Sequence, residues 1–210
     1  MKAAIICNGS ILDYELCRQR LKNVKVVICA DGGARHTFHM NVTPDIILGD
    51  LDSAKDEYID FYRQKQVPIV QFSPDKDKTD TQLCLEYALE RYDDILLLGA
   101  TGTRLDHTLG NISLLRLAAD MGKQVCILDD HNEIRLIKDK ITLEGHKEDI
   151  LSLVPLSSKV EGITLTGVYY PLENAVMEIG NPYGISNRFK EATVELSIKS
   201  GYLLVIKSQD

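Results

Sequence analysis

The stretch Val24-Lys25-Val26-Val27-Ile28-Cys29-Ala30-Asp31-Gly32-Gly33 joins a short, mostly apolar run to a polar, glycine-rich end. An apolar run without strict alternation is typical of a strand covered on both faces, as in a parallel sheet. Similar runs recur through the first 130 residues, separated by longer segments with helical patterns. This alternation predicts an open, doubly wound α/β fold with a mainly parallel sheet and helices on both faces. The other runs are Ala3–Cys7, Asp45–Leu48, Pro68–Phe72, Ile95–Leu98 and Val125–Leu128.

Four helices are expected between these runs. Ser10 with Asp13, and Ser53 with Asp56, resemble capping boxes that would open helices ending near residues 21 and 65. The other two helices are expected over residues 79–92 and 105–121. In the last of them, apolar residues follow the spacing of one buried stripe. The stripe consists of Leu105, Leu109, Ile112, Leu115 and Ala119.

The pattern changes after about residue 132. Short strand-like segments separated by Gly, Pro and Asn follow one another, and Val194–Ile198 alternates with period two. This half is predicted to be a C-terminal antiparallel β-sandwich. We therefore expect two domains, an α/β domain over residues 1–131 and a β-sandwich over residues 132–210.

Charge and composition exclude several classes of protein. The 210 residues include 24 Lys and Arg against 31 Asp and Glu, a net charge of −7, so nucleic acid is not an expected partner. No apolar run approaches the roughly 18 residues of a membrane span. The five cysteines form no CxxC pair, which favours a reducing, cytoplasmic setting.

Polar residues follow five successive strands of the predicted sheet. Because ligands of open α/β sheets bind beyond the carboxyl ends of the strands, these segments are the candidate site. Each segment combines Gly, Asp, Asn or hydroxyl residues, and five such ends are hard to explain as ordinary solvated loops. The segments are Asn8–Ser10, Asp31–Gly33, Gly49–Ser53, Ser73–Asp80 and Gly99–His107.

Carboxylates dominate two of these strand ends. Asp50 and Asp52 can point to one side of an extended segment and suit Mg²⁺, although Asp52 or Ser53 could instead cap the next helix. Gly32 and Gly33 would let a phosphate or base approach the backbone, although they could equally form a tight turn.

The segment before the third helix mixes both charges. Asp75, Asp77 and Asp80 alternate with Lys76 and Lys78, as either a polyphosphate site or a solvated loop.

A further polar stripe opens the last helix. Arg104, His107 and Asn111 are spaced to share one face near the helix N-terminus, where backbone N–H groups attract anions. A polar helix face with one histidine is the alternative. Neither GxxxxGK[ST] nor a GxGxxG after the first strand is present, so the usual phosphate loops are missing. The residues alone indicate a Mg²⁺-assisted, phosphate-handling site built from carboxylates.

Taken together, these motifs resemble the thiamine pyrophosphokinase (thiamine diphosphokinase) family, bacterial type. The resemblance implies an N-terminal ATP-binding domain and a C-terminal thiamine-binding β-sandwich. It also implies a homodimer with thiamine between subunits and transfer of pyrophosphate from ATP to the thiamine hydroxyl, leaving AMP. The matching segments are Asp31–Ala34, Pro44-Asp45, Gly49–Ser53, Asp77–Asp80, Gly102–His107 with Asn111, and Gly184–Phe189.

The resemblance also assigns roles to residues. Asp50, Asp52 and Asp80 would be catalytic and hold Mg²⁺ and the phosphates, and Ser186 and Asn187 would reach thiamine. Which carboxylate orients or deprotonates the hydroxyl stays open. The implied nucleotide-binding residues are Asp31, Gly32, Gly33, Lys78, Thr79, Thr101, Gly102, Arg104, Asp106, His107 and Asn111.

One feature departs from the family. Eukaryotic members carry a Trp near the C-terminus that packs on the substrate, whereas this chain has none and reads Tyr202-Leu203-Leu204-Val205-Ile206 there. Two other functions compete with the family reaction: a different Mg²⁺-dependent phosphotransferase or phosphohydrolase, and a non-catalytic nucleotide sensor. The sensor would be expected to lose its acidic residues, but the carboxylates are present.

Overall fold

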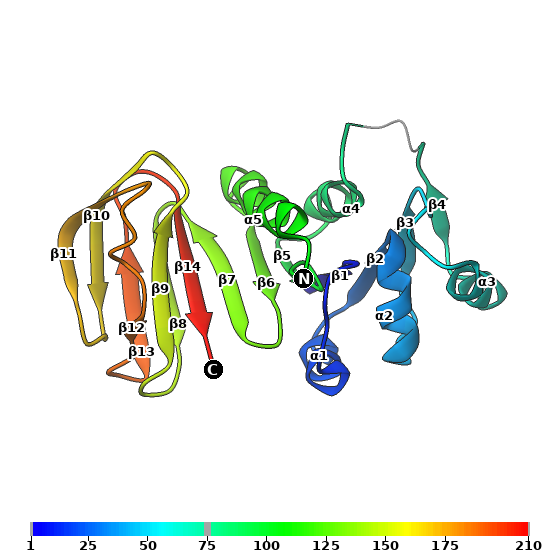
Figure 1. Cartoon of the computed structure of the whole chain (residues 1–210), viewed down its shortest axis with the longest axis horizontal. Coiled ribbons are helices and arrows are strands. Elements are labelled where there is room, and N and C mark those ends of the chain that lie inside the picture. The colour runs from blue at the N-terminus through cyan, green and yellow to red at the C-terminus, as the bar shows by residue number, and fades with distance from the viewer. Residues whose placement is uncertain (1, 74–76, 210) are drawn as a thin grey trace. The chain divides into compact units, whose positions relative to one another are not determined.

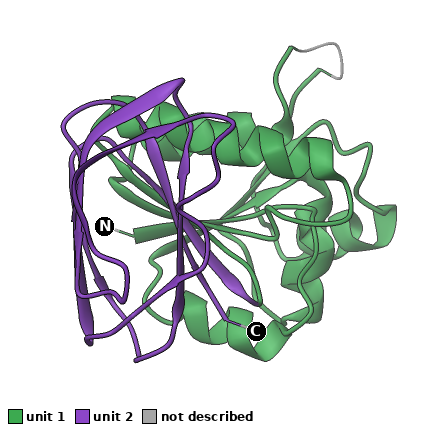
Figure 2. Ribbon diagram, turned by 60° about the vertical axis from the view of Figure 1, so that its left-hand side comes forward, with its two compact units in different colours: residues 1–130 green, residues 131–210 purple. Residues whose placement is uncertain are grey.

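The computed structural model of the chain describes residues 2–73 and 77–209 (Figure 1). It divides into two compact units, residues 1–130 and 131–210 (Figure 2). The expected boundary, between residues 131 and 132, lies one residue further along the chain.

The first unit is built on a parallel sheet in the order β6-β5-β1-β2-β3-β4. Its central strands are buried after their first residue, which agrees with the continuous apolar runs of the sequence. The mainly parallel α/β fold is thus confirmed for this half of the chain. The strands are β1 (Lys2–Ile6), β2 (Val26–Ala30), β3 (Ile46–Gly49), β4 (Ile69–Gln71), β5 (Asp94–Leu98) and β6 (Gln124–Leu128).

Helices cover both faces of this sheet. Figure 1 shows α4 and α5 on one face and α1 and α2 on the other. A 3₁₀ turn, η1 (Asp31–Gly33), leads directly into α2, which the sequence analysis did not predict because six residues are too few to show periodicity. The helices are α1 (Tyr14–Leu21), α2 (Ala34–His39), α3 (Asp56–Gln64), α4 (Asp80–Leu89) and α5 (Leu105–Asp120).

The helix starts differ from the predicted capping boxes. The N-cap of α1 is Asp13 rather than Ser10, and its side chain accepts a hydrogen bond from Leu16 N at 2.9 Å. The N-cap of α3 is Lys55 rather than Ser53, and no side chain caps this helix. Both predictions were wrong because the chain bends before each helix, and a capping pattern does not reveal such bends.

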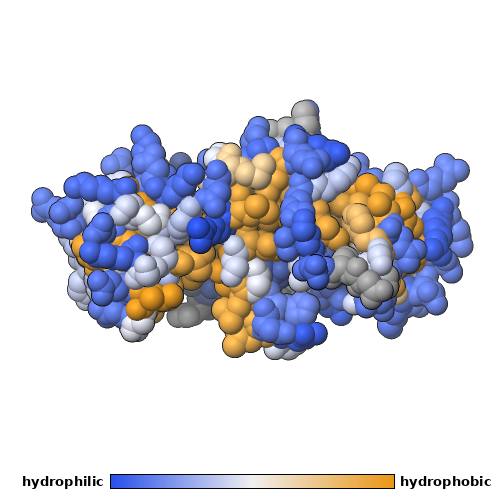
Figure 3. All heavy atoms as spheres, turned by 90° about the horizontal axis from the view of Figure 1, so that it is seen from above, coloured by the Kyte–Doolittle hydropathy of each residue, from blue (hydrophilic) through white to orange (hydrophobic). Residues whose placement is uncertain are grey.

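The predicted buried stripe of α5 is only half buried. Leu115 and Ala119 lie in the core, but Leu105 and Leu109 are 67% and 55% exposed. Only the C-terminal part of the helix packs fully on the unit. Figure 3 shows apolar atoms at the surface over the region of α5.

The second unit contains two antiparallel sheets that share one hydrophobic core. One has the order β12-β9-β14-β7 and the other β11-β10-β13-β8. Core residues come from both sheets, among them Leu151, Leu203, Val160 and Val194. The predicted β-sandwich is therefore confirmed. Its strands are β7 (Asn132–Ile137), β8 (Lys140–Glu144), β9 (Ile150–Pro155), β10 (Lys159–Thr166), β11 (Leu172–Glu178), β12 (Asn187–Arg188), β13 (Thr193–Ser197) and β14 (Leu203–Ser208).

Two further observations concern the chain as a whole. Within the described residues, no helix combines the length and apolar character needed to cross a membrane. All five cysteines are free and buried, so they serve as small core residues.

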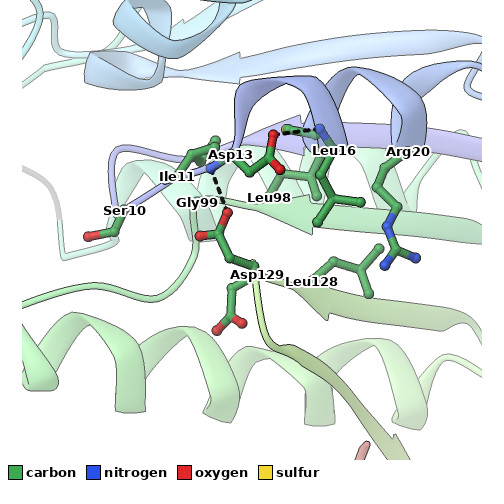
Figure 4. Close-up of a pocket in the computed structure, with 11 residues that line it drawn as sticks. Ser10, Ile11, Asp13, Leu16, Arg20, Leu98, Gly99, Leu128 and Asp129 are labelled. Atoms are coloured by element: carbon green, nitrogen blue, oxygen red, sulfur yellow. Dashed lines mark hydrogen bonds between the residues drawn. The ribbon is translucent and has the colours of Figure 1, made fainter. Parts of the chain in front are cut away.

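The loop after β1 is fixed by several hydrogen bonds. Gly9 N donates to Gly99 O at 2.7 Å, and Ser10 N donates to Thr101 O at 2.7 Å. Further along, the Asp130 carboxylate accepts from Leu12 N and from Asp13 N, the latter at 2.8 Å. Figure 4 shows the small pocket beneath this loop, beside the Asp13 cap. The loop thus holds a defined conformation beside the strand ends.

Candidate functional site

The register of β2 and β3 brings two polar strand ends together. Ala30 pairs with Leu48, so Asp31 and the Gly49-Asp50 segment leave the sheet side by side. Parallel strands present their carboxyl ends at one edge, where ligands of open α/β sheets bind. The site is therefore assembled by strand pairing.

Three carboxylates meet at this edge and form what we call the aspartate cluster: Asp31, Asp50 and Asp52. One carboxylate oxygen from each lies within 4.8 Å of the others. An extended segment was predicted for Asp50 and Asp52. The structure differs, because Leu51 between them has a φ of +67°. This left-handed turn, sparsely populated by side-chain-bearing residues, brings both carboxylates toward Asp31.

Asp31 is the buried member of the aspartate cluster. It is 3% exposed and also left-handed, with a φ of +42°. Its Oδ2 accepts from Ser53 N at 3.3 Å, whereas its buried Oδ1 has no hydrogen-bond partner among the described residues. Burial raises the pKa of Asp31, and the negative charges of Asp80 and Asp50 act in the same direction. This carboxylate thus lacks a positive partner that burial would normally require.

The donor set fits a hard divalent cation. Mg²⁺ binds carboxylate oxygens and fills its remaining positions with water and phosphate oxygens. Oδ1 of Asp31 is buried and has no hydrogen-bond partner among the described residues, so this carboxylate keeps an oxygen that its protein neighbours leave unsatisfied. From the sequence, Asp31 was expected to contact the nucleotide and not the metal. In the structure it belongs to the aspartate cluster, and Asp80 lies close enough to raise its pKa.

Gly32 and Gly33 pack so closely against neighbouring atoms that packing alone explains the choice of glycine at these positions. A Cβ on Gly33 would lie 2.2 Å from Ile6 O, and one on Gly32 would lie 2.3 Å from the Asn8 amide nitrogen. The backbone contact excludes a larger residue at position 33, whereas a larger residue at position 32 would require the Asn8 side chain to move. The glycines therefore let η1 pack against the end of β1, a requirement that holds with or without a ligand.

The start of α4 supplies Lys78, Thr79 and Asp80. Thr79 is the N-cap, and its hydroxyl accepts from Gln82 N at 3.2 Å. Lys78 Nζ pairs with Glu86 at 2.8 Å on the exposed side of the helix. Asp80 opens the first turn. Asp75 and Lys76, two further charged residues considered in this segment, lie outside the described residues, whereas Asp77 is described and exposed.

Polar groups in the loop after β5 are bound internally. Thr101 Oγ1 donates to Asp129 at 3.0 Å, and Gly102 N donates to Thr108 Oγ1 at 3.2 Å. Asn111 is buried, and its amide donates to Ala100 O at 2.7 Å. These groups hold the loop in place. That Thr101, Gly102 and Asn111 also contact a nucleotide stays a prediction.

Arg104, Asp106 and His107 lie exposed at the start of α5. The Arg104 guanidinium binds the Asp106 carboxylate through two hydrogen bonds, of 3.2 and 2.5 Å. Hydrogen bonding to Arg104 lowers the pKa of Asp106 to about 2. The expected stripe of Arg104, His107 and Asn111 is divided, because Asn111 faces the interior whereas the other two face solvent.

In the second unit, Ser186 and Asn187 lead into β12. Ser186 is left-handed, with a φ of +61°, and its N–H donates to Ser152 Oγ at 3.0 Å. The Asn187 side chain makes two hydrogen bonds to the backbone of Tyr170. Its Nδ2 donates to the carbonyl at 2.8 Å, and its Oδ1 accepts from the N–H at 3.2 Å. Tyr170 itself is 73% exposed. Asn187 thus fixes an exposed aromatic residue.

Several residues near the aspartate cluster were not singled out by the sequence analysis. His36 is buried, and its ring bonds to Tyr14 Oη at 2.9 Å and Gly9 O at 2.9 Å. Arg35 Nη2 donates to Asn8 O and Gly9 O at 3.0 and 2.8 Å. Position within α2, immediately after Asp31-Gly32-Gly33, was the available signal for both residues.

Comparisons with known proteins match both units. Residues 17–127 match the family model described as "Thiamin pyrophosphokinase, catalytic domain". Residues 137–203 match that described as "Thiamin pyrophosphokinase, vitamin B1 binding domain". The two models therefore cover most of the chain in the order of its two units.

Curated relatives and solved structures agree with the family models. A thiamine pyrophosphokinase of Bacillus subtilis (strain 168) is 31% identical over 187 residues, which is 87% of each chain. Thiamine pyrophosphokinase 1 of rice, Oryza sativa subsp. japonica, is 30% identical, covering 85% of this chain and 77% of its own.

Among solved structures, the Bacillus subtilis thiamine pyrophosphokinase has a TM-score of 0.90 at 28% identity and full coverage of both chains. That of Geobacillus thermodenitrificans has a TM-score of 0.88 at 30% identity, covering 100% of this chain and 98% of its own.

The buried His36 should make stability depend on pH. Burial lowers its pKa to about 4, against 6.5 in an unfolded chain, so the unfolded state takes up a proton first as pH falls. We expect the free energy of unfolding to decrease between pH 6.5 and 4, by up to about 3 kcal/mol from this residue. Denaturant titrations of the wild type and His36→Gln across this range measure the difference.

The variant His146→Gln removes an exposed imidazole and serves as the control. If the free energy of unfolding of His36→Gln depends on pH in the same way as that of the wild type, His36 is not a buried neutral imidazole.

Proposed function

The chain belongs to the thiamine pyrophosphokinase family, and on this premise we propose that its aspartate cluster and Asp80 hold Mg²⁺ and the phosphates of ATP. The family's reaction transfers pyrophosphate from ATP to the hydroxyl of thiamine, giving thiamine diphosphate and AMP. The chain is accordingly a transferase of thiamine diphosphate biosynthesis.

One observation supports the metal most strongly. The buried Oδ1 of Asp31 has no partner among the described residues, and one oxygen of the same carboxylate lies within 4.8 Å of oxygens from two further carboxylates. Carboxylates this close repel one another. A bound cation attracts each of them and so offsets the repulsion. When bound, Mg²⁺ supplies positive charge to the phosphate oxygens. Asp31, Asp50, Asp52 and Asp80 are its proposed ligands.

The protein's own groups then position the reactants. In the transfer, the thiamine hydroxyl oxygen attacks the β-phosphorus, the bond from that phosphorus to the α-phosphate bridging oxygen breaks, and AMP leaves with the electron pair. The hydroxyl proton passes to a carboxylate of the site or to solvent. Little covalent chemistry falls to the protein, so placement and charge dominate catalysis.

Basic and backbone groups at neighbouring strand ends complete the proposal. Arg104 and Lys78 offset phosphate charge, exchanging their present partners Asp106 and Glu86 for phosphate oxygens. The surrounding loops are shaped or supported by five further residues: Thr79, Thr101, Gly102, His107 and Asn111. Ser186 and Asn187 contact thiamine from the second unit.

We also propose that the protein is a homodimer, with thiamine bound between subunits. The family resemblance supports this assembly, and sedimentation velocity tests it. We expect a single species of about twice the 23.5 kDa chain mass at assay concentrations. A fully active monomer would contradict it.

The products test the function. The wild-type protein incubated with ATP, Mg²⁺ and thiamine should form AMP and thiamine diphosphate in equal amounts, which chromatography separates. ADP and phosphate in place of AMP would indicate a phosphotransferase or phosphohydrolase of another kind. Nucleotide binding without product would indicate a sensor.

The metal is tested by the substitution Asp52→Asn. For the wild type without ATP, Mg²⁺ at ten times its Kd should raise the unfolding free energy by about 1.4 kcal/mol. Asp52→Asn should lose that shift and lower turnover at least about tenfold, equivalent to roughly 1.4 kcal/mol of transition-state stabilisation. Differential scanning calorimetry with and without Mg²⁺ measures the first effect.

Asp60→Asn, an exposed change on α3 outside the cluster, is the matched control. If Asp52→Asn keeps both the Mg²⁺-dependent shift and the turnover of the wild type, Asp52 is not a ligand.

A further inference from the structure

The four carboxylates proposed to hold Mg²⁺ are supported in two different ways. Asp31, Asp50 and Asp52 follow β2 and β3, and the backbone hydrogen bonds between these strands fix their spacing. Asp80 opens α4, which lies on one face of the sheet (Figure 1). The backbone groups of a helix bond within the helix, so side chains must attach α4 to the sheet. The distance from Asp80 to the aspartate cluster therefore depends on how α4 packs.

The packed face of α4 is fully buried. Cys84, Leu85 and Ala88 are each 0% exposed. Cys84 follows Asp80 by four residues, so the two side chains lie on the same side of the helix, one turn apart. The negative charge of Asp80 raises the pKa of Asp31, which places Asp80 near the aspartate cluster. Cys84 thus lies one helical turn from Asp80, on the side of α4 that packs on the sheet.

Cys84 contacts both strands that lead to the aspartate cluster. Its thiol is a weak donor to two backbone carbonyls, with Sγ 3.8 Å from Leu48 O and 4.0 Å from Cys29 O. Leu48 lies in β3 two residues before Asp50, and Cys29 lies in β2 two residues before Asp31. One sulfur atom therefore links α4 to the two strand segments that carry the cluster.

A second thiol connects the first turn of α4 to β1. The side chain of Thr81, the residue after Asp80, hydrogen-bonds to the thiol of Cys7, which directly follows β1. Cys7 is 1% exposed. Because β1, β2 and β3 are neighbours in the sheet, the start of α4 is attached to three adjacent strands.

The size of sulfur matters for the contact at Cys84. A hydroxyl donates to a carbonyl over about 2.7–2.8 Å, about 1 Å less than the distances from Sγ to Leu48 O and Cys29 O. A serine at this position would draw α4 closer to the sheet or leave its hydroxyl unbonded, and an alanine would leave a gap beneath the helix. Either change alters the position of α4.

Mg²⁺ is sensitive to small displacements of its ligands. It demands near-octahedral geometry with metal–oxygen distances of about 2.0–2.1 Å. A shift of α4 by a few tenths of an ångström would move Asp80 relative to the aspartate cluster and so weaken binding of the metal.

We propose that Cys84 is a positioning residue for Mg²⁺, and that its buried sulfur sets the distance between Asp80 on α4 and the aspartate cluster at the ends of β2 and β3. Because Cys84 is fully buried, it acts through Asp80 and not by contact with a substrate. This inference rests on the proposed function, which assigns these carboxylates to the metal.

Mg²⁺ binding to the full-length protein tests the proposal. Differential scanning calorimetry over a series of Mg²⁺ concentrations, without nucleotide, gives the Kd from the rise in Tm. Cys84→Ala and Cys84→Ser should each raise this Kd at least about fivefold, since a residue that orients a metal ligand commonly affects metal affinity strongly. Serine fills more of the volume of the thiol than alanine does, so Cys84→Ser serves if the alanine variant is too unstable.

Cys126→Ala is the matched control. Cys126 lies in β6 and is 1% exposed, and its thiol likewise contacts a backbone carbonyl, Ile127 O at 3.6 Å. In the sheet, β5 and β1 separate β6 from β2. The variant should lose stability as Cys84→Ala does, because both remove a buried sulfur. Its Kd for Mg²⁺ should nevertheless stay within about twofold of the wild type.

A double-mutant cycle tests whether Cys84 acts through Asp80. Asp80→Asn alone should weaken Mg²⁺ binding, because it removes a charged ligand. Adding Cys84→Ala to Asp80→Asn should then change the Kd by less than about twofold, since the carboxylate that Cys84 positions is already gone.

The outcomes separate the positioning role from the proposed function. A wild-type Kd for Mg²⁺ in both Cys84 variants would overturn the positioning role alone. So would an undiminished effect of Cys84→Ala in the Asp80→Asn background, because the thiol would then act through the strands. Absence of any Mg²⁺-dependent change in the Tm of the wild type, or a wild-type Kd in Asp80→Asn, would instead overturn the metal site of the proposed function.

Discussion

Repulsion among closely spaced carboxylates is the constraint around which the first unit is organised. Two unit charges 4.8 Å apart repel by about 3.5 kcal/mol near a protein surface, and by less where solvent screens them. The β2–β3 register nevertheless fixes Asp31 beside the Asp50 segment, and burial of Asp31 adds to the cost. Left-handed conformations at Asp31 and Leu51 and close glycine packing hold the arrangement in place. Backbone strain and like charges in one place are characteristic of functional sites.

Much of the architecture was predictable from the sequence, because hydrophobic periodicity reports burial directly. The apolar runs that became β1, β2 and β5 are buried on both faces, and the alternation around Val194 marked the sandwich. Local signals were weaker. The Ser10 and Ser53 capping patterns failed because bends before α1 and α3 moved the helix starts, and the stripe of α5 gave no sign that Leu105 and Leu109 are exposed.

Some residues of the candidate site could likewise be predicted from the sequence, and others could not. Residues at strand ends, such as Asp50 and Asp52, could be identified because topology alone gathers them. The place of Asp31 in the cluster depends on strand register and a left-handed backbone, neither of which a pattern encodes. Arg35 follows Asp31-Gly32-Gly33 closely in sequence, but α2 is too short to show a period that would reveal that this side chain binds the loop after β1.

The loop after β1 connects these features. Hydrogen bonds from Gly9 and Ser10 attach it to the loop after β5, Asp130 holds Leu12 and Asp13, and Arg35 and His36 bind its carbonyls from the other side. Because the loop after β1 is held by so many hydrogen bonds, it has already lost most of its conformational entropy on folding. A ligand entering beside it orders little additional backbone, so more of the contact energy is retained as affinity, and association requires no prior rearrangement of this loop.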